Sequence, residues 1–115
     1  MTIWAVSVYG VELTHDEALH MLTQIEPTDA ETLLDNLPYH FNKDYQLCRY
    51  FDLSIRTHFY IIKMWSHSHA THRDLEECHS FNVPSEADRD TFTKWVHNHL
   101  KMADKEPKFY SLVVN

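Results

Sequence analysis

Two segments of the chain are apolar on both alternating faces, which is typical of strands buried inside a sheet. Residues 3–13 read IWAVSVYGVEL and residues 58–65 read HFYIIKMW. Successive side chains of a strand point to opposite faces, so such segments need cover on both sides. Residues 45–55 instead alternate between apolar and polar positions, and residues 108–115 form a short β-rich segment. We therefore expect two central strands and two edge strands.

Helical patterns separate these strands. The letters THDE at residues 14–17 match a capping box, and apolar residues follow at helical spacing until Pro27 ends the helix. A second match, TDAE at residues 28–31, predicts a short additional helix. Ser85 is expected to cap an amphipathic helix that leads towards the last strand. The predicted order of elements is β-α-(α)-β-β-α-β.

This order predicts one α+β domain over residues 1–115, of the ferredoxin-like type. We expect a two-layer βαββαβ sandwich with a four-stranded antiparallel sheet in the order 4-1-3-2 and helices on one face. The extra short helix falls at residues 28–37. Strands 1 and 3 are the inner pair of that sheet, and they are the two segments that are apolar on both faces. Gly10, the single glycine, is expected at a bulge or at a close approach of a helix.

The composition narrows the classes of partner. Seventeen acidic and ten basic side chains give a net charge of −7, and no block of lysine and arginine is present to neutralise a phosphate backbone. We therefore expect no nucleic-acid partner. No stretch approaches the roughly 20 apolar residues of a membrane span, and the N-terminal residues lack the pattern of a signal peptide. We expect a cytoplasmic protein with no membrane partner and with reduced cysteines.

Motifs for catalysis are missing from the sequence. A single glycine excludes the Gly-rich loops that bind nucleotide phosphates. There is no H-E-x-x-H pair, no C-x-x-C pair and no G-x-S-x-G turn. We therefore assign no catalytic residue and no cofactor.

A group of histidines is the candidate metal site. The letters HSHATH place His67, His69 and His72 directly after the second central strand, and His79 follows closely. With His79 or Cys78 as the fourth ligand, the group could complete a tetrahedral zinc site, as in a metal-binding domain or a metal-dependent hydrolase. Histidine is frequent throughout this chain, however, and a solvated strand end accounts for the same pattern. We expect no stoichiometric zinc and keep the zinc site as the alternative.

The letters HNH contain a second pair of histidines, His97 and His99. Residues two apart on a helix point about 200° from each other, so this pair cannot face one metal ion. His99 falls on the apolar stripe of the expected helix and is predicted to be a core or boundary residue.

The leading functional expectation comes from the second face of the inner strands. Helices on one face of a flat sheet leave the other face in water, and monomers seldom expose apolar patches above roughly 300–600 Å². We expect a non-enzymatic protein-interaction module, a small acidic adaptor or stoichiometric inhibitor, of viral or mobile-element origin. It would form a homodimer or bind another protein, with sheet faces or edge strands in contact. The expected contact residues are Trp4, Val6, Val8, Tyr60, Ile62 and Met64.

Overall fold

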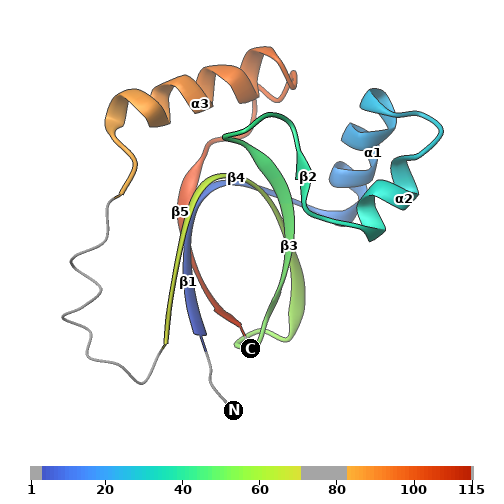
Figure 1. Ribbon diagram of the computed structural model, residues 1–115. Coiled ribbons are helices and arrows are strands. Elements are labelled where there is room, and N and C mark those ends of the chain that lie inside the picture. The colour runs from blue at the N-terminus through green and yellow to red at the C-terminus, as the bar shows by residue number, and fades with distance from the viewer. Residues whose placement is uncertain (1–3, 71–82, 115) are drawn as a thin grey trace.

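The computed structural model describes residues 4–70 and 83–114 and shows an α+β fold (Figure 1). Antiparallel strands form one open sheet in the order β2-β3-β4-β1-β5. The strands are β1 (Trp4–Leu13), β2 (Tyr39–His40), β3 (Gln46–Asp52), β4 (Thr57–Ala70) and β5 (Lys108–Val114). The helices of the described residues are α1 (His15–Ile25), α2 (Ala30–Asp35) and α3 (Glu86–Asn98).

The sheet differs from the predicted four-stranded sheet in strand count and in order. The additional strand β2 pairs Tyr39 with Leu47 and His40 with Gln46. As a result β3 lies inside the sheet, where the sequence predicts an edge strand. Two residues are too few to show a strand pattern, which is why β2 is not visible in the sequence. β1 and β4 pair with each other, and each has a further strand on its other side.

A bulge at Gly10 brings the two inner strands close together. Tyr9 pairs with Trp65 whereas Gly10 pairs with Lys63, so the β1–β4 register shifts between these positions. A Cβ atom on Gly10 would overlap the backbone of Ile62 and Lys63. The predicted bulge is therefore confirmed, and the element that approaches Gly10 is a strand and not a helix.

The outer face of the sheet packs against the helices. Val11 of β1 and Ile62 of β4 share a core with Leu22 of α1, Leu34 of α2 and Phe92 of α3, and none of these is more than 4% exposed. Figure 1 shows α3 and the α1–α2 pair on the outside of the curled sheet. This first core is the helix-covered layer that the amphipathic patterns predict.

The inner face of the sheet is covered by the sheet itself. The strands curl so that β3 and β5 approach each other from opposite sides of the β4–β1 pair (Figure 1). Leu53, which follows β3, donates its N–H to the carbonyl oxygen of Val113 at 2.8 Å. The rings of Phe59 and Tyr110 meet across the curl with centroids 5.2 Å apart. A second core fills this space; its buried members are Val6, Val8, Cys48, Phe59, Ile61 and Leu112.

Asp52 lies at the end of this second core. The alternation of residues 45–55 places Asp52 on a polar, solvent-facing side, but the residue is only 5% exposed. The curl of the sheet turns that side of β3 inward. One carboxylate oxygen of Asp52 accepts hydrogen bonds from the backbone N–H and the hydroxyl of Ser54, at 2.9 and 2.7 Å. These bonds satisfy a buried carboxylate and hold the turn between β3 and β4.

Side-chain caps begin α1 and α3 as predicted. The Thr14 hydroxyl accepts the N–H of Glu17 at 3.1 Å, and the Glu17 carboxylate accepts the N–H of Thr14 at 3.0 Å. Ser85 caps α3. The capping box expected at residues 28–31 is wrong, because Asp29 occupies the N-cap position of α2 and makes no side-chain cap bond.

Replacing Gly10 with alanine should lower the free energy of unfolding by more than about 2 kcal/mol, because the new methyl group overlaps the β4 backbone. Urea unfolding followed by tryptophan fluorescence measures the effect. Ser68→Ala is the control, since Ser68 is exposed in the same β1–β4 ladder and its replacement should cost less than about 0.5 kcal/mol. A Gly10→Ala protein as stable as the wild type would contradict the close approach.

An ion pair joins the first turn of α1 to the segment before β5. Lys105 Nζ lies 2.7 Å from Glu17 Oε2. The hydrogen bond from Lys105 lowers the pKa of the Glu17 carboxyl, and the same bond raises the pKa of Lys105. Both side chains are partly exposed to solvent, so the pair contributes at most about 1 kcal/mol to stability.

Glu17→Gln keeps an oxygen that can accept the Thr14 N–H but removes the charge. The free energy of unfolding at pH 7 should therefore fall by less than about 1 kcal/mol. Because folding lowers the pKa of Glu17, the pair stabilises above the unfolded carboxyl pKa, and this contribution is lost as the pH falls through the folded value. Denaturant unfolding should therefore show the difference between the two proteins shrinking as the pH falls below the ordinary carboxyl pKa, because the Glu17 carboxylate is then protonated. Equal stability at pH 7 would show that the pair contributes nothing.

Candidate functional site

The sheet face that was expected to bind a partner is not open to solvent. Val6 and Val8 are buried in the second core, at 4% and 0% exposure. Tyr60 and Ile62 are buried in the helix-covered core, at 8% and 0%. An open apolar face requires a flat sheet, and the curl removes that face.

The other two expected contact residues do not restore the surface. Met64 is partly buried against the helix-covered core. Trp4 is described by its backbone alone, which pairs with Ala70 and Val114. Val6 and Val8 belong to the second core whereas Tyr60, Ile62 and Met64 belong to the helix-covered core, so the structure does not bring these five residues together.

The histidine cluster is described only in part. His67 and His69 both belong to β4, two residues apart on one strand, as expected if the strand continues past residue 65. His72 and His79 lie outside the described residues. In the part of the chain that the structure describes, no group of three or more His, Cys, Asp or Glu side chains could hold a metal ion. The zinc alternative stays a prediction.

The two histidines of α3 have different structural partners. His97 Nε2 donates to the carbonyl oxygen of Lys105 at 2.8 Å and lies 3.6 Å from Glu106 Oε1, so it holds the segment that leads into β5. The ring of His99 is exposed and stacks on Trp95, with centroids 5.7 Å apart and planes 17° apart. His99 is therefore a surface residue and not the core or boundary residue that the sequence predicts.

Cys48 is a core residue with low reactivity. It lies in the second core at 8% exposure. Burial raises the pKa of the Cys48 thiol even though Lys63 acts in the opposite direction. The thiolate, which is the nucleophilic form, is therefore disfavoured at neutral pH.

The outer edge of β5 is a strand edge that the described residues leave partly unpaired. β5 pairs with β1 on one side, and Leu53 bonds to Val113 on the other. The N–H and C=O of one residue in an antiparallel ladder point to the same side, and that side alternates along the strand. The C=O of Val113 points away from β1, because it accepts the N–H of Leu53. The N–H and C=O groups of Phe109 and Ser111 therefore point away from β1 as well. No strand of the described residues pairs with them there.

Phe109 lies beside this edge in a fixed position. The residue is 49% exposed, and its ring centroid lies 4.7 Å from that of Tyr9 and 6.1 Å from that of Trp65. The guanidinium of Arg89 on α3 lies 5.9 Å from the ring centroid of Phe109 and 6.0 Å from that of Tyr9. A half-exposed aromatic ring that is already held by its neighbours loses little entropy on binding. We use "the β5 edge" for the outward backbone groups of Phe109 and Ser111 together with the Phe109 ring.

The sequence indicates the β5 edge only weakly. Residues 108–115 are predicted as an edge strand, but none of them is named as a contact residue. The available signal is Pro107 followed by Lys108, since both residue types are typical of strands that face solvent at a sheet edge. Arg89, which contacts Phe109, belongs to α3, and no pattern in the sequence near either residue indicates this contact.

Comparisons with known proteins do not assign the chain to a class. No protein-family model, curated protein or solved structure matches it. The helices in the described part of the chain are all too short or too polar to cross a membrane. A function therefore has to be proposed from the geometry of the surface.

Proposed function

We propose that the chain is a non-enzymatic protein-interaction module that pairs with a second copy of itself through the β5 edge. One observation carries the proposal: the N–H and C=O groups of Phe109 and Ser111 point to the side of β5 where no strand of the described residues pairs with them, beside an aromatic ring that is held in place and half exposed. Addition of a strand to an open sheet edge is a common mode of protein recognition.

The register of the outward groups suits a two-fold axis. When two β5 strands run antiparallel about an axis at Tyr110, Phe109 of one copy faces Ser111 of the other. Each outward N–H then meets an outward C=O, so the edge is self-complementary, as a two-fold homodimer requires. The ladder ends at Val113, whose C=O already bonds to Leu53. It ends in the other direction at Pro107, which has no N–H to donate. A ladder this short supports a dissociation constant of about 10 µM to 1 mM.

Charge modulates this pairing. Each copy carries a net charge of −7, so two copies repel each other at low salt. Salt screens such repulsion over distances of about 10 Å at 0.1 M ionic strength. A weak dimer of this kind therefore gains affinity as the salt concentration rises, which separates it from association driven by ion pairs.

We also propose a ferredoxin-like architecture and a cytoplasmic location for the chain. In the chain, helices connect β1 to β3 and β4 to β5. In the sheet, β4 lies between β1 and β3, and β1 lies between β4 and β5. This arrangement supports a ferredoxin-like relationship with an added edge strand. A buried free thiol at Cys48 supports a reducing compartment such as the cytoplasm.

Phe109→Lys and Ser111→Pro should each weaken self-association at least tenfold. The lysine removes the exposed ring and places a charge at the edge, and the proline removes an N–H that points away from β1. Sedimentation velocity between about 10 µM and 1 mM protein should show wild-type mass rising from 13.7 kDa towards the dimer. The variants should stay monomeric over the same range.

Phe51→Lys is the matched control, because Phe51 is 44% exposed but belongs to β3, where it pairs with His58 of β4. It should associate like the wild type. A wild-type protein that is monomeric at every concentration, or a Phe51→Lys protein as impaired as Phe109→Lys, would overturn the proposal.

A further inference from the structure

A cavity of about 380 Å³ lies between the first turn of α3, the outer side of β4 and the turn before β3. Its size is within the range of small-molecule sites in proteins, roughly 300–1,000 Å³. It does not include the outward groups of the β5 edge. Its lining residues are Asp44, Tyr45, Met64, Trp65, Pro84, Asp88 and Thr91.

The turn that carries one side of the cavity is held by hydrogen bonds. Asn42 Oδ1 accepts the backbone N–H groups of Asp44 and Tyr45, at 2.8 and 2.9 Å. The N–H of Phe41 donates to the carbonyl oxygen of Tyr45 at 3.0 Å, which closes the turn. The backbone position of Asp44 is therefore set before any ligand arrives.

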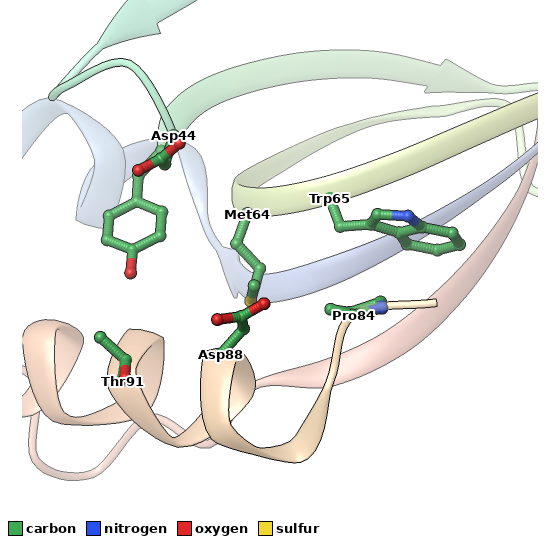
Figure 2. A pocket seen from close by; sticks show the side chains of 7 residues that line it. Asp44, Met64, Trp65, Pro84, Asp88 and Thr91 are labelled. Atoms are coloured by element: carbon green, nitrogen blue, oxygen red, sulfur yellow. The ribbon is translucent and has the colours of Figure 1, made fainter. Parts of the chain in front are cut away.

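The opposite side is the start of α3. Ser85 accepts the N–H of Asp88 at 3.1 Å and so fixes the first turn. Figure 2 shows Asp88 pointing from α3 towards Met64, while Trp65 lies next to Pro84. The cavity thus combines a carboxylate with a thioether and an aromatic surface.

Two carboxylates, those of Asp44 and Asp88, line this space, and no lysine or arginine is found among its lining residues in the described part of the chain. Neither Asp44 nor Asp88 has a side-chain hydrogen bond or ion pair among the described residues. Burial and then the charges of Asp44 and Asp88 raise the pKa of the Tyr45 phenol, as expected when both carboxylates lie near the same ring. The helix dipole accounts for an acid at the start of α3, but it does not account for Asp44.

We propose that this cavity binds a guanidinium group on an aliphatic stem, with the cation between Asp44 and Asp88 and the stem against Met64 and Trp65. Guanidinium pairs with carboxylates through its planar donors and stacks on aromatic rings, and the cavity offers both surfaces. Such a group is carried by a free alkylguanidine or by an arginine of a polypeptide. The proposal does not depend on pairing at the β5 edge.

Titration of the ¹⁵N-labelled protein with N-acetyl-arginine amide, followed by NMR, tests the site. Saturable shifts should include the backbone amide of Tyr45 and the indole of Trp65. N-acetyl-citrulline amide has nearly the same shape without the charge, and it should bind at least tenfold more weakly. Comparison with n-butylguanidine distinguishes the sources: tighter binding of the capped amino acid indicates a polypeptide arginine, and tighter binding of the alkylguanidine indicates a free ligand.

Asp44→Asn and Asp88→Asn should each weaken binding of N-acetyl-arginine amide at least fivefold. Asp90→Asn is the matched control, since Asp90 is exposed on the same helix and does not line the cavity. Thermal unfolding of each variant shows whether the fold is intact. Equal binding of the citrulline and arginine compounds, equal affinity of all three variants, or shifts confined to other surfaces would overturn the proposal.

Discussion

The curl of the sheet is the constraint on which the rest of the structure depends. β1 and β4 carry apolar side chains on both faces, and the helices cover only the outer face. A flat sheet would leave Val8 and Ile61 in water. The bond between Leu53 and Val113 and the contact of Phe59 with Tyr110 close the inner face with residues of the same chain. The chain therefore needs no partner to bury its second apolar layer.

This solution changes where the chain can meet another protein. Once both sheet faces are buried, contact through a broad apolar surface is no longer available, and backbone groups at a strand edge become the natural alternative. The curl also determines which part of that edge is open. In the C-terminal half of β5, the outward C=O of Val113 bonds to Leu53. In the other half, no strand of the described residues pairs with the outward groups of Phe109 and Ser111. Burial of the second core and exposure of the β5 edge thus have one geometric cause.

Local patterns in the sequence predict the parts of the fold that depend on neighbouring residues. The two-faced patterns of β1 and β4, the bulge at Gly10 and the caps at Thr14 and Ser85 all follow from such signals. The curl does not, because it depends on contacts such as Leu53 with Val113, which are far apart in the chain. The burial of Asp52 and the burial of Val6 and Val8, which were expected in the interaction face, follow from the curl. The position of Phe109 likewise depends on residues far apart in the chain, Tyr9, Trp65 and Arg89, and the cavity depends on the approach of α3 to β4 and to the turn before β3.

The shared position of β1 and β4 between two cores has a consequence for the dynamics of the chain. Their central amides are hydrogen-bonded to strands on both sides and lie between two dry layers, so solvent reaches them only when the whole sheet opens. The α1–α2 pair, in contrast, contacts the outer layer alone and can detach without exposing Val8 or Ile61. Hydrogen exchange should accordingly divide the molecule into a slow inner sheet and a faster helical cover, with the boundary running through the first core.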